Sequence, residues 1–425
     1  MRRQEMKVKQ WTLPQRQDHI KKLRNSGVSI FKDQIDFQGT IQAFDVFWVD
    51  IGLPCYRLSN GRTRSAQKET IVEKKLKDDF FSADPDSDPA LREQEAILRK
   101  KIGDTILLKI LKEKKQNEPL ILDNDGYIVN GNRRICAMRW LIEQDETKYA
   151  HFKNVQVIFL SPCADRDIKE LEGKLQVAPD SKEEYSWVDK ALLYRELREQ
   201  TPSWTDDQIA DLYEEKKKDI QDLLAMLDEA EQYMESRNRK GYYSQILKKE
   251  SAFRQLQRAK RKLADEPKKQ LMTCISYLML DDQNIQRRLY ESIPDAHKYL
   301  DVIADRIQNE FKKDISALKV EKDNLGILGE EVQNPYAGVI EILKVPSNNE
   351  AINVIKDTLE EMSTNEKERK DSTYFSKQIQ KAYTALQNAS NAFSENSEVV
   401  GVVETLKNIK DLALAIKNRI GNAND

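Results

Sequence analysis

The sequence predicts an α+β protein whose N-terminal part is mixed and whose middle and C-terminal parts are mostly α-helical. Before residue 170, short segments rich in branched and aromatic residues alternate with helical patterns, whereas after about residue 180 the strand signals fade. Of the 425 residues, 39% are hydrophobic and 33% are charged, so the chain can bury sizeable cores beneath a well-solvated surface. We expect three domains, spanning residues 1–175, 176–265 and 266–425.

Four strands are predicted in the first of these domains. Leu120–Asp123 and Gly126–Asn130 are apolar segments separated by Asn-Asp, which is typical of a hairpin, and the other two are Gln42–Ile51 and Asn154–Leu160. Residues 80–91 are rich in Pro, Asp and Ser and predict a loop. Residues 92–115 carry apolar side chains at helical spacing and are predicted to be helical.

Helices are predicted through the rest of the chain. Residues 183–200 form the first, and Thr205 is placed to cap a second whose first turn holds Asp206 and Asp207, where carboxylates meet free backbone N–H groups. Residues 219–234 predict a third. Beyond residue 265 we expect helix almost throughout, with breaks at Asn324–Gly326, Gln333–Gly338, Pro346–Asn349 and Glu360–Asp371.

Composition argues against several classes of protein. The four cysteines are scattered without CxxC spacing and there are three histidines, which disfavours a zinc site and a disulfide scaffold. No apolar run approaches the length of a transmembrane helix and no signal-peptide core is evident, so we expect a reduced, cytoplasmic protein with no membrane contact. The formal net charge of −2 neither favours nor excludes a nucleic-acid partner.

The most informative stretch is Gly131-Asn132-Arg133-Arg134, between a predicted strand and a predicted amphipathic helix. Gly131 permits a tight turn and a close ligand, and Asn132 is placed to cap the helix. Two cations in a first helical turn are disfavoured by the helix dipole, and a bound anion would offset that cost. Arginine forks also match phosphate in a bidentate manner. The stretch therefore predicts a phosphate-binding turn, the alternative being surface arginines paired with Asp or Glu.

The residues 118–141, EPLILDNDGYIVNGNRRICAMRWL, resemble the phosphate-binding box of the ParB/sulfiredoxin superfamily, which reads approximately G-E-R-R-x-x-A in chromosome-partition ParB proteins. Gly131, Arg133, Arg134 and Ala137 match, and Asn132 replaces the glutamate. Sulfiredoxins carry a cysteine just after this glycine, where Asn132 stands. The resemblance implies a ParB/sulfiredoxin-like N-terminal domain that binds a nucleoside triphosphate such as CTP or ATP.

Two further segments follow the family order. Residues 56–64, YRLSNGRTR, lie where the family's first nucleotide-contacting segment stands, which places Arg57, Asn60 and Arg62 near a base or ribose. Residues 170–200 resemble the next ParB box, roughly E-N-x-Q-R. Glu172 and Gln176 match it with a spacing one residue longer, and Gly173 stands in the place of the asparagine. The resemblance implies that this box helps to hold the triphosphate and Mg²⁺. Glu172 is also the best candidate catalytic acid or base, its alternative being a solvated carboxylate at a helix end.

A helix-turn-helix follows this box in ParB proteins, and residues 201–230 have the corresponding shape. The resemblance would place Lys216, Lys217, Lys218 and Gln221 against DNA, although Asp219 and Asp222 would bring negative charge there. An ordinary helical hairpin is the alternative. Residues 265–425 resemble no family, and a protein partner for this helical part is one expectation.

Three functions remain open from the sequence. The first is a ParB-like nucleotide-binding protein that acts on DNA, in which nucleotide controls a clamp or a homodimer. The second is an enzyme on the same scaffold, an NTPase, nuclease or small-molecule kinase, because distant superfamily members do such chemistry in mobile-element and phage-defence systems. The third is a non-enzymatic adaptor whose ParB-like fold has lost its ligand.

Overall fold

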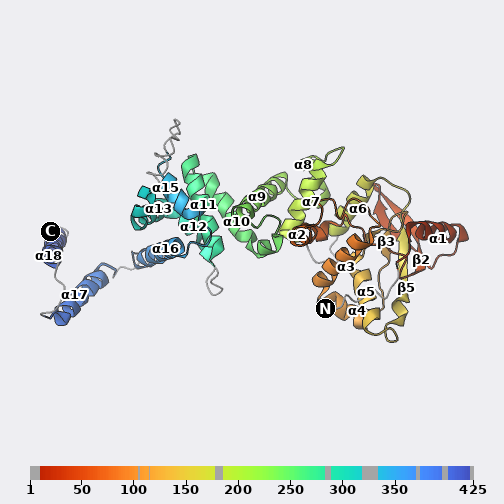
Figure 1. Cartoon of the computed structure of the whole chain (residues 1–425), viewed down its shortest axis with the longest axis horizontal. Helices are drawn as coiled ribbons and strands as arrows, with labels where there is room; N and C mark the ends of the chain where they lie inside the picture. The colour runs from red at the N-terminus through yellow and green to blue at the C-terminus, as the bar shows by residue number, and fades with distance from the viewer. Residues whose placement is uncertain are drawn as a thin grey trace. The chain divides into compact units, whose positions relative to one another are not determined.

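The chain folds as a mixed α+β protein with a small five-stranded sheet near its N-terminus (Figure 1). The computed structural model describes residues 10–103, 106–113, 115–177, 185–282, 289–317, 334–369, 374–394 and 401–421. Contacts divide the chain into two compact units, residues 1–355 and 356–425. The finer division into three domains stays a prediction.

The sheet has the strand order β1-β2-β5-β3-β4. Its strands are β1 (Phe31–Phe37), β2 (Thr40–Asp50), β3 (Leu120–Leu122), β4 (Ile128–Asn130) and β5 (Asn154–Phe159). Neighbouring strands are antiparallel except β3 and β5, which are parallel. The predicted hairpin and the other two predicted strands are confirmed. β1 was not predicted, because its sequence FKDQIDF mixes charged with apolar residues.

Helices cover both faces of this sheet. Those before residue 178 are α1 (Leu13–Ser26), α2 (Arg64–Lys74), α3 (Asp88–Ile102), α4 (Ile106–Glu113), α5 (Asn132–Gln144) and α6 (Asp165–Val177). On one face, Met138 of α5 and Leu98 of α3 share a core with Val49 of β2. On the other face, Ile168 and Leu171 of α6 pack with the strands. The layers therefore fix α5 and α6 on opposite faces of the sheet.

After residue 185 every described element is helical. The α-helices are α7 (Trp187–Glu199), α8 (Asp206–Tyr213), α9 (Lys217–Ser236), α10 (Glu250–Lys262), α11 (Glu266–Asp281), α12 (Ile293–Lys298), α13 (Leu300–Glu310), α15 (Ala337–Lys344), α16 (Asn349–Arg369), α17 (Tyr374–Ala392) and α18 (Val402–Gly421). The predicted cap is confirmed, since the Thr205 hydroxyl accepts a hydrogen bond from the Gln208 N–H at 3.3 Å. None of the described helices carries an apolar stretch that would cross a bilayer.

Several boundaries differ from the predictions. The stretch 92–115, predicted to be helical, is divided between α3 and α4, because α3 ends at Ile102 and its cap Gly103 has a φ of +39° that departs from helical geometry. The first of the two helices also begins four residues earlier, at Asp88. No break occurs at Glu360, since α16 continues to Arg369. The predicted break at Asn324–Gly326 lies outside the described residues, as do Gln333 and residues 370–371.

Candidate functional site

The strand–turn–helix around Gly131 forms as the sequence predicts, but its glycine has a structural purpose. β4 ends at Asn130 and α5 begins at Asn132, with Gly131 between them at φ +113°. A Cβ on Gly131 would lie 2.4 Å from Cδ2 of Leu120, a fully buried side chain. Backbone conformation and packing therefore both require glycine here, whether or not a ligand approaches.

The helix cap is Gly131 rather than Asn132, so that expectation is wrong. Asn132 is the first residue of α5 and is buried, where its Nδ2 donates to the Ile128 carbonyl at 3.3 Å. Because that amide points back along β4, it does not satisfy an N–H of the first helical turn. Arg133 is half-buried beside it.

Arg134 is held by the chain segment that leads into β3. It donates to the carbonyls of Glu118 at 2.9 Å and Pro119 at 3.2 Å, and it forms an ion pair with the Glu118 carboxylate. Burial lowers the pKa of this arginine, and the charge of Glu118 acts in the opposite direction. The alternative interpretation, an arginine paired with an acid, thus describes Arg134 as the structure has it. A phosphate at this turn would share the guanidinium with Glu118 or displace it.

The loop after β2, which carries Arg57, is held by the buried Arg139. Arg139 of α5 is 1% exposed and donates to the carbonyls of Ile51 at 2.8 Å and Pro54 at 2.6 Å. Its guanidinium also lies 4.8 Å from the ring centre of Tyr56. These charge-assisted hydrogen bonds to backbone carbonyls hold the loop in one conformation.

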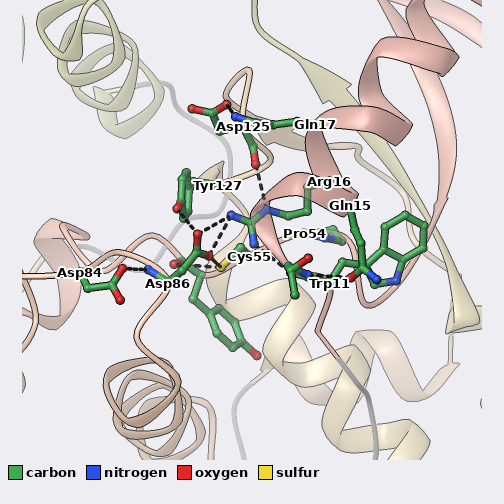
Figure 2. A network of polar contacts seen from close by, with 12 residues as sticks. Trp11, Gln15, Arg16, Gln17, Pro54, Cys55, Asp84, Asp86, Asp125 and Tyr127 are labelled. Carbon is green, nitrogen blue, oxygen red and sulfur yellow. Dashed lines mark hydrogen bonds and ion pairs between the residues drawn. The ribbon is translucent and has the colours of Figure 1, made fainter.

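A second buried arginine, Arg16 of α1, is also 1% exposed and lies near Cys55 of this loop (Figure 2). Arg16 donates to the carbonyls of Asp125 and Trp11, both at 2.9 Å, and to the Asp86 carboxylate at 2.9 Å. The Tyr127 hydroxyl donates to the same carboxylate at 2.9 Å. Burial raises the pKa of the neighbouring Cys55 thiol to about 12, so that thiol stays protonated at neutral pH.

Arg57 projects from this fixed loop to α6. The guanidinium is nearly buried, with Nε donating to the Ser59 hydroxyl at 2.8 Å and one terminal nitrogen to Asp165 at 2.5 Å. The other terminal nitrogen is buried and has no hydrogen-bond partner among the described residues. A buried cationic donor without an acceptor is costly, so this nitrogen favours an anionic or carbonyl group nearby.

Two charged residues of α6, Lys169 and Glu172, lie beside Arg57. Lys169 is 4% exposed and donates to Glu196 of α7 at 2.5 Å. Burial, together with the charges of Arg64 and Arg57, lowers the pKa of Lys169 to about 8. Burial raises the pKa of the Glu172 carboxyl, against the opposing charges of Arg57, Lys169 and Arg64. The pKa values of Lys169 and Glu172 are thus shifted towards each other.

Arg64, at the start of α2, completes this set through an ion pair with Glu196. Its Nε is buried and has no hydrogen-bond partner in the described part of the chain. The name Arg57 cluster is used below for the six charged residues Arg57, Arg64, Asp165, Lys169, Glu172 and Glu196. Three elements and one loop supply these residues, namely α2, α6, α7 and the loop after β2.

The other residues predicted near a base or ribose lie at the edge of this cluster. Asn60 accepts a hydrogen bond from the Arg62 N–H at 3.0 Å, which closes the short turn before α2. The Arg62 guanidinium lies 5.4 Å from the ring centre of Tyr185, whose own pKa is raised by burial and by the charge of Glu172. The side-chain oxygen of Asn60 therefore serves the turn, and Arg62 lies against an aromatic ring.

The departure from the E-N-x-Q-R pattern also has a packing reason. A Cβ on Gly173 would lie 2.7 Å from Leu212 of α8, so the glycine lets α6 and α8 approach closely. Gln176 follows one turn after Glu172 in α6, but its side chain lies outside the described residues.

The predicted DNA-contacting residues lie at the start of α9. The segment 214–216 joins α8 to α9, with Glu214 at a left-handed φ of +52° where a glycine would be usual. Lys216, Lys217 and Lys218 are exposed. However, Lys217 pairs with Asp207 at 2.9 Å, and Gln221 donates to Asp206 at 2.9 Å. These contacts join the two helices and neutralise part of the basic surface.

The structure therefore brings Arg57 and Glu172 together, while Arg134 is occupied at residues 118–119. Sequence analysis missed Arg64, Lys169 and Glu196. Arg64 ends the quoted segment YRLSNGRTR, and Lys169 precedes Glu172 by three residues on the same helical face, so both had a signal. Glu196 had none, because only the packing of α7 brings it here.

No protein-family model matches the chain, and no curated protein matches it. Among the residues that the structure describes, no group of three or more His, Cys, Asp or Glu side chains could hold a metal ion. Mg²⁺ held by Glu172 would therefore draw its other ligands from phosphate oxygens and water, as Mg²⁺ often does.

Proposed function

We propose that this chain is a ParB-like protein that binds a nucleoside triphosphate, CTP or ATP, and acts on DNA as a homodimer or clamp. One observation carries the proposal. Arg57 and Glu172, assigned to the ligand from separate segments of sequence, belong to one charged cluster that contains buried guanidinium nitrogens without acceptors. Phosphate oxygens would supply such acceptors.

The charge balance of the Arg57 cluster also indicates that a triphosphate would need a cation with it. Its three cations, Arg57, Arg64 and Lys169, are matched by three carboxylates, Asp165, Glu172 and Glu196. A triphosphate alone would add negative charge to this balanced set, so the proposal includes Mg²⁺ with the nucleotide. Protonation of Glu172, whose pKa is already raised, would serve the same end.

The test is calorimetric titration of the full chain with ATP, GTP and CTP, each with Mg²⁺. The Arg133→Ala/Arg134→Ala variant should lose binding at least tenfold. Glu118→Gln is the matched control, because it removes the acid partner of Arg134 and keeps the arginine. If Arg134 binds phosphate, Glu118→Gln should bind as well as the natural chain or more tightly.

Two other outcomes would contradict the proposal. No binding of any triphosphate by the folded chain, with or without DNA, would favour the adaptor. Binding unaffected by Arg133→Ala/Arg134→Ala would remove these arginines from the ligand. The DNA part is tested separately by Lys216→Ala/Lys218→Ala, which should weaken DNA binding and reduce its salt dependence.

An enzyme on the same site is the second candidate, favoured by the opposed pKa shifts of Glu172 and Lys169. A carboxyl with raised pKa next to an amine with lowered pKa is suited to moving a proton at neutral pH. Turnover of a triphosphate or of DNA that disappears in Glu172→Gln, while nucleotide binding persists, would establish this candidate. Binding without turnover in the natural chain would exclude it for the nucleotide tested.

A further inference from the structure

A cleft of about 550 Å³ lies between the start of α1 and the end of β2. Its lining includes Gln10 and Trp11 from the segment before α1, Asp18 and His19 from α1, and Asp50 and Ile51 from the end of β2. This volume is within the range of pockets that bind small ligands. The lining shares no residue with the Arg57 cluster, so the cleft is a separate candidate site.

Backbone hydrogen bonds hold the walls of this cleft in place. The Trp11 N–H donates to the Gly52 carbonyl at 3.0 Å, and the Trp11 carbonyl accepts from Arg16 at 2.9 Å (Figure 2). The Trp11 ring lies edge-on to His19, with ring centres 5.0 Å apart. The Ile51 N–H donates to the carbonyl of Lys153 at 2.9 Å. A ligand would therefore have to order little of the protein when it binds.

The charge of the lining that is left without a partner is negative. The Asp18 carboxylate pairs with Lys22 at 2.6 Å, and the ammonium of Lys153, which also lines the cleft, pairs with Glu146 at 2.7 Å. The Asp50 carboxylate is exposed and forms no ion pair within the part of the chain that the structure describes. The cleft therefore favours a cationic group beside Asp50.

Two neutral groups of the lining define the rest of the ligand. The Nε2 of Gln10 is buried and has no hydrogen-bond partner among the described residues. A buried amide donor without an acceptor is costly, so this nitrogen favours a carbonyl oxygen brought by the ligand. The half-buried ring of Trp11 offers an apolar surface to an aliphatic chain and attracts a cation over its face.

We propose that this cleft binds an arginine or lysine residue of a peptide. The cationic group lies at Asp50, the aliphatic chain lies against Trp11, and a peptide carbonyl accepts a hydrogen bond from Gln10. A free polyamine has the cation and the chain but lacks the carbonyl, and an acidic peptide is repelled by Asp50. This inference goes beyond the proposed function and does not depend on a nucleotide.

The experiment is fluorine NMR of the full chain with fluorotryptophan in place of its five tryptophans. The probe is Nα-acetylarginine methylamide, and the Trp11 resonance, assigned with Trp11→Phe, should shift saturably with a dissociation constant of about 1 mM. Two matched probes dissect the ligand. Nα-acetylcitrulline methylamide lacks the charge and butylguanidinium lacks the carbonyls, and each should bind about fivefold more weakly.

Three variants assign these losses to residues. Asp50→Asn should weaken the arginine probe about fivefold and remove its advantage over the citrulline probe. The amide oxygen can still accept from the Gly52 N–H, as the carboxylate does at 2.7 Å, so the fold should be kept. Asp45→Asn is the matched control, because it removes an equal charge from β2 outside the cleft and should leave affinity unchanged. Gln10→Leu should remove the advantage of the arginine probe over butylguanidinium.

Several results would overturn the proposal. One is the absence of a saturable Trp11 shift up to about 10 mM probe, while the resonances of Trp140, Trp187 and Trp204 show the folded chain. Equal binding of the citrulline probe, or equal weakening by Asp45→Asn and Asp50→Asn, would show that no specific ion pair forms at Asp50. Equal binding of butylguanidinium would exclude the peptide and identify a simple cation site.

Discussion

Arg16 and Arg57 are both nearly buried arginines that contact the region around the loop after β2, but their guanidinium groups are used differently. Every nitrogen of Arg16 donates to a fixed acceptor, namely Asp125, Trp11 or Asp86 (Figure 2). Arg57 donates through two nitrogens and leaves the third buried without an acceptor among the described residues. The first pattern stabilises a fold, and the second leaves one donor for the ligand that we propose.

The strongest way to test this difference is to make the same substitution at both arginines. Arg16→Gln should lower the free energy of unfolding by about 3 kcal/mol, because it removes the cation that pairs with Asp86 and the donor of two backbone carbonyls. Chemical denaturation followed by tryptophan fluorescence measures this. A loss below about 1 kcal/mol would show that the Arg16 network is not structural.

The free energy of unfolding should depend on pH through Lys169 of the Arg57 cluster. The folded pKa of about 8 lies below the ordinary value of 10.5, so between these pH values the unfolded chain binds more protons. Stability should therefore rise with pH across this window, by about 2 kcal/mol, and Lys169→Met should remove that rise. The measurement is the difference in unfolding free energy between natural chain and variant at pH 7.5 and 10. If the unfolding free energies of the natural chain and Lys169→Met changed equally with pH, Lys169 would not be buried as a cation.

Arg57→Gln should change stability little, by about 1 kcal/mol or less, because Asp165 is exposed and one guanidinium nitrogen already lacks an acceptor. Nucleotide affinity should nevertheless fall at least tenfold in the calorimetric titration. The opposite result, a large loss of stability with unchanged affinity, would place Arg57 in the same class as Arg16.

The smallest effect is expected at Glu118, whose carboxylate pairs with Arg134 on a half-exposed surface. Glu118→Gln should lower stability by about 0.5 kcal/mol, as is usual for such pairs. Thermal unfolding in low and high salt checks this, because screening should reduce the difference. A loss several times larger would mean that Arg134 belongs with the structural arginines and is poorly available to phosphate.

Local patterns predicted much of the fold. The apolar segments flanking Asn124-Asp125 predicted the β3–β4 hairpin, and Thr205 with its two aspartates predicted the start of α8. β1 was missed because its pairing with β2, rather than its own composition, makes it a strand. The break between α3 and α4 was missed because apolar spacing continues through Gly103.

Some residues of the candidate site could likewise be predicted from local sequence patterns, and others could not. Arg57, Glu172 and the Gly131 turn could be selected from sequence, because each stands in a short segment with its own pattern. Glu196 and the pairing of Arg134 with Glu118 could not, because those contacts join residues whose separation along the chain carries no local signal.

By itself the sequence determined where most of the strands and helices form, since hydrophobic spacing and capping residues act over a few neighbouring positions. Only the tertiary structure decided what each arginine does. Arg16 donates through every guanidinium nitrogen, Arg139 donates through one nitrogen to two backbone carbonyls, and Arg134 meets Glu118. Arg57 faces α6 with one nitrogen that has no acceptor among the described residues. The physical reason is that the hydrogen-bond partners and burial of a cation are set by residues distant in the chain, which meet when the sheet and helices pack.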